Sequence, residues 1–147
     1  MMRAMKPIRW MAAAIAALTL DASAAVQWNE LRKDAAARLS VDPASMKRRG
    51  DQVSLHYLVD YAKPQGDSLH QVRYRSIVTA ATLRCKARTL MLGMSELYSG
   101  PAATGVVIAT AEPAPKERVF APIEKGTSDE DLWRHACEKK PAEGAKR

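Results

Sequence analysis

The residues that could do chemistry in this chain of 147 residues are three histidines, two cysteines and many basic side chains. The histidines are His56, His70 and His135, and no H-E-x-x-H, G-x-S-x-G or phosphate-loop motif accompanies them. His135 and Cys137 are two residues apart, so they do not share a helix face at ligand spacing. The sequence therefore predicts no enzyme, no metal site and no cofactor, and each histidine is interpreted as a surface residue.

The N-terminus has the three regions of a secretory signal peptide. Residues 1–9 carry three basic side chains, and residues 10–20 form an uncharged apolar run of 11 residues, which is too short to span a bilayer. Ala22, Ser23 and Ala24 then give the small-x-small pattern that precedes cleavage. We expect residues 1–24 to be removed, which leaves no transmembrane anchor; a membrane anchor or a buried helix is the alternative. No cysteine follows the apolar run, so a lipid anchor at the cleavage site is not expected.

Two cysteines in an exported chain are most simply one structural disulfide, here between Cys85 and Cys137. Closing a loop of this order stabilises a chain by roughly 4 kcal/mol in the chain-entropy model. The bond would clamp the last helix onto the inner face of a sheet.

Basic residues are the better candidates for a functional site. The net charge is +7, and the predicted cleavage removes three basic residues and one acidic residue, which leaves +5. A positive surface of this kind binds an acidic protein segment, a sulfated glycan or an anionic lipid; the alternative is a solvated sheet face. Export disfavours nucleic acid. The candidate residues, which could align across neighbouring strands, are Lys47, Arg48, Arg49, Arg73, Arg75, Arg84, Lys86 and Arg88.

The elements that must position these residues are strands. The segment 52–61 alternates apolar and polar residues, with Val53, Leu55, Tyr57, Val59 and Tyr61 on one face, as in a half-buried antiparallel strand. The longest predicted strand, 71–86, places Ile77, Ala81, Leu83 and Cys85 on one face, and the next, 89–98, does the same with Leu90, Leu92, Met94 and Tyr98. Further strands are expected at 25–31, 46–49 and 106–110, and an edge strand at 119–123. Residues 32–39 are predicted to be irregular or partly helical, and residues 63–67 a loop.

A C-terminal helix is predicted over residues 129–138. Thr127 and Glu130 have the spacing of a capping box, and Leu132, Trp133, Ala136 and Cys137 form one stripe. The sequence thus predicts an α+β domain at 25–140, with five to six antiparallel strands, one face covered by the helix, and a disordered tail at 141–147. Trp28, Tyr57, Tyr61, Trp133, Met91 and Met94 are interpreted as core or sheet–helix packing, with a haem or other apolar ligand between sheet and helix as the alternative.

Several short motifs in this order resemble one family. They are Trp28, D-x-x-S-M-x-x-x-G from Asp42, L-x-D-Y from Leu58, Y-x-S from Tyr74 with a cysteine nine residues after Ser76, Tyr98-Ser99, Gly105-Val106, and P-I-x-x-G-T-S-x-E-x-L from Pro122. This pattern covers nearly all of the mature chain and is similar to the surface-adhesin protein E family of Gram-negative bacteria. The resemblance implies a six-stranded sheet with a helix tethered by Cys85–Cys137. It also implies dimers, binding of host matrix and serum proteins, and a link to haemin, although the family namesake's lipidation cysteine is absent.

Two functions from different classes follow. The first is an exported, non-enzymatic binding protein of the adhesin type, secreted or periplasmic. The second is a periplasmic structural or envelope component whose sheet edge pairs with a partner. Surface accessibility would separate them, because an adhesin must reach the outside of the cell.

Overall fold

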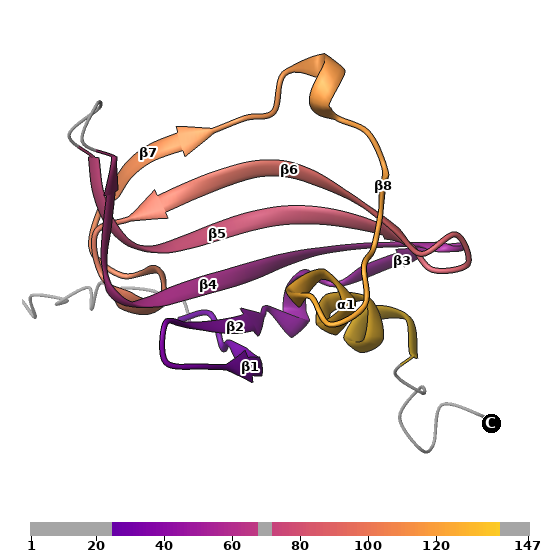
Figure 1. Ribbon diagram of the computed structural model, residues 1–147, viewed down its shortest axis with the longest axis horizontal. Helices are drawn as coiled ribbons and strands as arrows, with labels where there is room; N and C mark the ends of the chain where they lie inside the picture. Colours follow the sequence, from indigo (N-terminus) through magenta and orange to yellow (C-terminus); the bar gives the residue numbers. More distant parts are fainter. Residues whose placement is uncertain (1–24, 68–71, 139–147) are drawn as a thin grey trace, which may run out of the picture.

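The structure is a computed structural model that describes residues 25–67 and 72–138. Within these residues it contains one eight-stranded antiparallel sheet and a short helical segment near the C-terminus (Figure 1). Six strands lie side by side in the order β1-β2-β4-β5-β6-β7, while β3 pairs with β4 and β8 with β6. The strands are β1 (Asn29–Lys33), β2 (Ala37–Val41), β3 (Lys47–Arg49), β4 (Gln52–Asp67), β5 (Val72–Arg84), β6 (Thr89–Tyr98), β7 (Val107–Ala111) and β8 (Ala121–Pro122). The predicted α+β class is confirmed, whereas the predicted signal peptide, His70 and the predicted tail lie outside the described residues.

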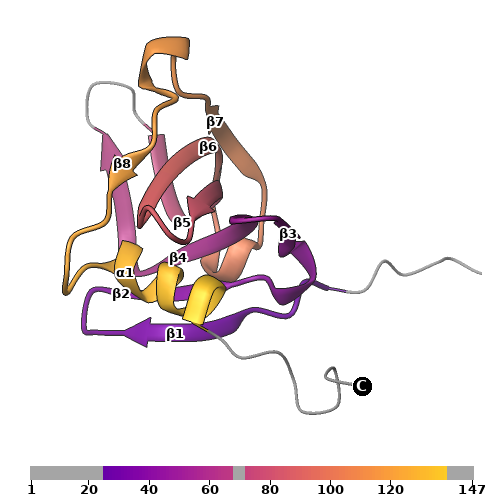
Figure 2. The same cartoon turned by 90° about the vertical axis from the view of Figure 1, so that its right-hand side faces the viewer.

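The helical segment begins as the α-helix α1 (Ser128–Trp133) and continues as a π-helical turn, η4 (Arg134–Glu138). Thr127 is its N-cap, and the Thr127 hydroxyl accepts the backbone N–H of Glu130 at 3.4 Å. The segment lies against one side of the curved sheet, beside β1 and β2 (Figure 2). No helix in the described part of the chain is long and apolar enough to cross a membrane.

The side of the sheet that packs against the helical segment, called the helix face below, carries the main core. Leu132 and Ala136 of the helical segment pack there, with Trp133 and Cys137 partly buried beside them, as the predicted stripe required. Alternate positions of the strands meet this stripe because side chains of a strand alternate between its two faces. The buried residues that the strands contribute are Leu39, Val41, Val53, Leu55, Ala81, Leu83 and Leu90.

The prediction that residues 32–39 are irregular or partly helical is wrong, because they form most of the β1–β2 hairpin. The carboxylate of Asp34 accepts the backbone N–H groups of Ala36 and Ala37 at 2.8 and 2.9 Å, which closes the turn. These bonds also lower the pKa of Asp34. β2 then pairs with β4 and buries Leu39, so tertiary pairing outweighs the helix propensity of the alanines.

The predicted loop at residues 63–67 is instead the last part of β4. Pairing with β5 is regular as far as Asp60 and resumes at Gln65, with a shift of register between them. Pro64 lies inside this irregular stretch, where its missing N–H removes no regular ladder bond. Pro64 therefore correctly indicated an irregularity in the pairing, but β4 does not end there.

The faces of β6 also differ from the prediction. Ala81 pairs with Leu92 and Thr79 with Ser95, so two residues of β6, Gly93 and Met94, lie opposite a single residue of β5. This β-bulge moves every later side chain of β6 to the opposite face. Leu90 and Leu92 consequently lie on the helix face, whereas Met94 and Tyr98 do not, and Met94 is 49 % exposed.

Candidate functional site

The face of the sheet opposite the helical segment is called the open face below. Cross-strand partners in an antiparallel sheet share a face, so the pairing defines rows of side chains across it. One row runs Lys47–Ser54–Thr82–Met91 and the next runs Arg49–Gln52–Arg84–Thr89, from β3 through β4 and β5 to β6. His56 and Ala80 lie opposite each other in the row on the other side of Ser54. The small side chains of Ser54, Thr82 and Ala80 leave the open face hollowed beside the longer Gln52 and Arg84.

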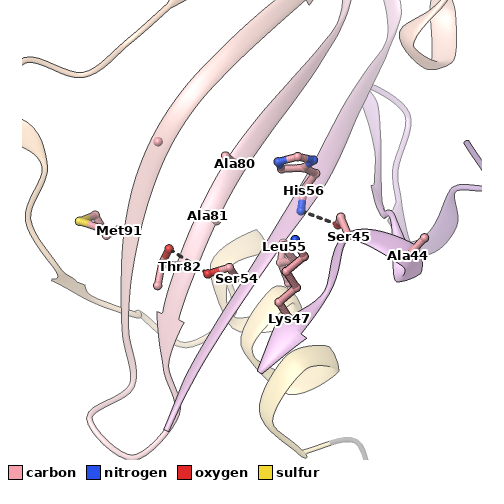
Figure 3. Close-up of a pocket in the computed structure, with 11 residues that line it drawn as sticks. Ala44, Ser45, Lys47, Ser54, Leu55, His56, Ala80, Ala81, Thr82 and Met91 are labelled. Atoms are coloured by element: carbon pink, nitrogen blue, oxygen red, sulfur yellow. Dashed lines mark hydrogen bonds between the residues drawn. The ribbon is translucent and has the colours of Figure 1, made fainter. Parts of the chain in front are cut away.

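A first hollow of about 470 Å³ lies between β3 and β6 (Figure 3). Lys47 and His56 lie at its β3 side, Met91 lies at its β6 side, and small residues form the floor between them. On that floor the hydroxyls of Ser54 and Thr82 lie 3.5 Å apart. The hollow therefore offers a cation, two hydroxyls and an apolar wall, a combination that suits binding.

A second hollow of about 360 Å³ lies further along the same face. Trp28, Val78 and Tyr98 line it together with the carboxylates of Asp42 and Glu96. The Tyr98 hydroxyl donates a hydrogen bond to Glu96 Oε2 at 2.7 Å, and this bond raises the pKa of Tyr98. The second hollow is thus aromatic and acidic where the first is basic.

The placement of Trp28, Met91 and Met94 corrects the prediction that they pack in the core. Trp28 and Met91 line the two hollows of the open face, and Met94 is exposed after the bulge. The predicted packing holds for Trp133 and Tyr57, which pack against the main core. The sequence predicted a strand at 25–31 that included Trp28, but β1 begins at Asn29, so strand alternation could not place Trp28 at the second hollow.

The structure brings three of the eight predicted basic residues together on the open face. Lys47, Arg49 and Arg84 lie in two adjoining rows at one end of the sheet. The Arg84 guanidinium lies over the ring of Phe120, 3.7 Å from its centroid. Among the described residues, no carboxylate lies within ion-pair distance of Lys47 or Arg49. These two cations are exposed and available to a partner.

Two other predicted residues contact the helical segment instead. Arg48 points to the helix face and donates a hydrogen bond from Nη2 to the Ala136 carbonyl at 2.9 Å. Arg88 lies 4.2 Å from the ring centroid of Trp133 and 3.7 Å from the carboxylate of Glu130. Both guanidinium groups stabilise the docking of the helical segment.

The last three predicted residues lie elsewhere. Arg73 and Arg75 are at the far end of β5, where Arg75 Nε donates to the Tyr61 carbonyl at 2.8 Å. Lys86 lies in the β5–β6 turn, and its backbone N–H donates to the carboxylate of Asp51. The eight residues do not form one continuous stripe.

The disulfide between Cys85 and Cys137 joins the β5–β6 turn to the end of the helical segment, with 5.5 Å between the two Cα atoms. Trp133 Nε1 donates to the Cys85 carbonyl at 3.1 Å next to this bond. Arg32 of β1 adds an ion pair of 3.1 Å to Asp131. Several bonds therefore hold the helical segment on the sheet at both of its ends.

The described histidines do not meet, because His56 is on the open face and His135 is on the helical segment. In the described part of the chain, no group of three His, Cys, Asp or Glu side chains could hold a metal ion. What the open face offers is charge, hydroxyls and aromatic rings around two hollows, an arrangement suited to binding a partner.

Comparison with known proteins supplies the family. A family model described as surface-adhesin protein E matches residues 28–138. No curated protein matches the chain. The structure of Haemophilus influenzae protein E superposes with a TM-score of 0.57 at 16 % identity, covering 76 % of this chain and 83 % of that one. The crystal structure of protein E from non-typeable Haemophilus influenzae gives a TM-score of 0.55 at 14 % identity, covering 77 % and 76 %.

At these identities the structural matches bear on the fold alone, and they agree with the antiparallel sheet and C-terminal helix described above. The family model covers most of the chain and carries the assignment. The chain belongs to the surface-adhesin protein E family.

Proposed function

We propose that this chain is an exported, non-catalytic binding protein of the adhesin type, which binds an anionic partner at the basic end of its open face. The N-terminal segment 1–24, the disulfide and membership of an adhesin family support export. The observation that carries the binding site is the placement of Lys47 and Arg49 beside the first hollow without a carboxylate partner among the described residues.

The electrostatics of this end favour an anion. Lys47, Arg49 and Arg84 occupy adjoining rows, and their positive potentials add over a short distance. The stacking of Arg84 on Phe120 holds its guanidinium plane in place, which lowers the entropy that binding would cost. Sulfate and carboxylate groups accept charge-assisted hydrogen bonds from such side chains.

Charge reversal tests the site. We expect mature protein with Lys47→Glu and Arg49→Glu to bind immobilised heparin about tenfold more weakly at low ionic strength, with the difference shrinking as salt is added. The matched control is Lys33→Glu with Lys63→Glu, which makes the same change of charge at exposed positions on β1 and on the far part of β4. Equal loss in both variants would mean that net charge, and not this site, governs binding.

A second candidate function is supported by the free edge of the sheet. Among the described strands β7 pairs only with β6. It carries no charged residue, its Val107 is exposed, and Val106 just before it is 67 % exposed. Such an edge is a template for pairing with another strand. It suits a periplasmic envelope component, or pairing of two copies of this chain. Protease treatment of intact cells separates the functions: degradation supports an adhesin, and protection until the outer membrane is opened supports the periplasmic component.

A further inference from the structure

The two hollows of the open face adjoin, because His56 lines both of them. The two adjoining hollows are called the open-face trough below; they cross the rows of Ser54, His56 and Leu58 on β4, with the exposed His56 at their junction. Four residue steps of a strand rise about 13 Å, so the open-face trough can take four or five residues of an extended chain. Its two volumes, about 470 and 360 Å³, each lie in the size range of ligand sites.

The two ends of the open-face trough carry opposite charge. Lys47 lines one end, with Arg49 one row beyond it. Glu96 lies at the other end, in the row of Leu58 and Val78, and Asp42 lines the second hollow next to His56. Each carboxylate accepts one hydrogen bond from a neighbouring group of the protein, but none of the ion pairs between described residues includes Asp42, Glu96 or Lys47. The charges at both ends are left for a ligand to compensate.

The floor and walls have different chemistry. The floor is made of short side chains, among them Ala80 and Thr82, and of Gly93, where an added Cβ would lie 3.4 Å from the Ala80 Cβ. The walls are apolar or aromatic, with Met91 beside the basic end and Trp28 beside the acidic end. A low floor between apolar walls leaves room for a main chain whose side chains reach the walls and ends.

We infer that the open-face trough binds an extended peptide segment of a partner protein, with acidic side chains at the Lys47 end and a basic side chain at the Glu96 end. An aromatic or aliphatic residue of the segment lies between them, against Trp28. This inference rests on the proposed function, because it names the ligand class for the same face.

Charge complementarity favours a peptide over a glycan or a lipid surface. A sulfated glycan or an anionic membrane carries one sign of charge along its whole length. Such a ligand would satisfy Lys47 but would bring negative charge to Asp42 and Glu96, where like charges repel. A peptide can carry both signs in one short segment, and its aromatic residue can pack on Trp28.

The test uses mature, oxidised protein and labelled synthetic peptides of about five residues, long enough to span the open-face trough. The probe peptide has two glutamates at one end, a central tyrosine and two lysines at the other end, and is made in both sequence orders. A peptide of the same composition with the charges interleaved is the control. By fluorescence anisotropy, we expect at least one order of the probe to bind about tenfold more tightly than the interleaved control, because interleaving places like charges together at the ends of the open-face trough.

Substitutions in the open-face trough test whether the probe peptide binds there. Ala80→Tyr fills the floor, and Glu96→Gln removes charge at the acidic end with little change of shape; we expect each to weaken probe binding several-fold. Lys33→Glu, at the other end of the sheet, should leave probe binding unchanged. Near-ultraviolet circular dichroism checks that every variant is folded, and Glu96→Gln still tests the site where Ala80→Tyr fails this check.

The outcomes separate the two proposals. If heparin binds through Lys47 and Arg49 but the probe and the interleaved peptide bind equally, the peptide inference is overturned and the proposed function stands. If neither Ala80→Tyr nor Glu96→Gln weakens binding of the probe, the ligand occupies the basic end only, and the inference is again overturned. If neither heparin nor any peptide binds the wild-type protein, both proposals fail.

Discussion

Replacing Cys137 by serine should lower the free energy of unfolding by about 2–5 kcal/mol and release the helical segment while the central strands stay folded. The bond closes a loop with a sequence separation of 52 residues, so its loss gives the unfolded chain much conformational freedom. The helical segment 128–138 is shorter than the ~12–15 residues that an isolated helix needs to be stable in water. Its contacts with the sheet must therefore hold it in place.

Without the disulfide, the helical segment is still held by Leu132 and Ala136, which are buried in the main core. Polar contacts add to this packing: the Trp133 hydrogen bond to Cys85, the Arg48 hydrogen bond to Ala136, the contacts of Arg88 with Trp133 and Glu130, and an exposed ion pair to Arg32. An exposed ion pair adds only about 0–1 kcal/mol. The strands β4, β5 and β6, in contrast, pair with one another along most of their length.

Hydrogen exchange measured by mass spectrometry checks this prediction. Amides of residues 128–138 should exchange quickly in Cys137→Ser, and amides of β4 and β5 should keep most of their protection. The double variant Cys85→Ser with Cys137→Ser is the control for effects of a free thiol. Fast exchange throughout the strands would contradict the prediction and would mean that sheet and helix unfold as one unit.

Much of this fold could be predicted from local patterns. Strict alternation placed Val53 and Leu55 on the buried face of β4, and a capping residue with an apolar stripe located the helical segment. Compartment and cysteine count alone indicated the disulfide that the structure contains. These features depend on neighbours in sequence or on composition, so a single chain reveals them.

The rest depends on partners that are distant in sequence. β2 is a strand because β4 pairs with it, and the β6 bulge exists because Gly93 and Met94 face one residue of another strand. The candidate site also depends on contacts between residues that are distant in sequence. Arg84 and Arg88 form one basic cluster in the sequence, yet in the fold Arg84 stacks on Phe120 at the open face, whereas Arg88 contacts Trp133 and Glu130 of the helical segment. Only the three-dimensional structure distinguishes a basic side chain that is available to a partner from one that already contacts other side chains of the protein.

Leu58→Ala should be as costly as a substitution in the main core, although alternation places Leu58 on the face that was expected to be solvated. Leu58 is only 2 % exposed. It lies between Ser40 of β2 and Val78 of β5, and the 3₁₀ turn η2 (Pro101–Ala103) packs against β4. Ser76 secures this turn, because its hydroxyl donates to the Gly100 carbonyl at 2.7 Å and accepts the Ala103 N–H at 2.9 Å.

The open face therefore has a small core of its own beneath one end. Truncating a fully buried leucine costs about 2–5 kcal/mol through lost burial and the cavity that remains, a large share of the ~5–15 kcal/mol that stabilises a small domain. Ser54→Ala is the matched control, because Ser54 is exposed on the same face of the same strand, and we expect it to change stability by less than about 0.5 kcal/mol. Urea denaturation of both oxidised variants measures the difference. A loss below about 1 kcal/mol for Leu58→Ala would show that η2 packs loosely over this face. The second hollow, which Trp28 and Tyr98 line, would then lack a rigid support.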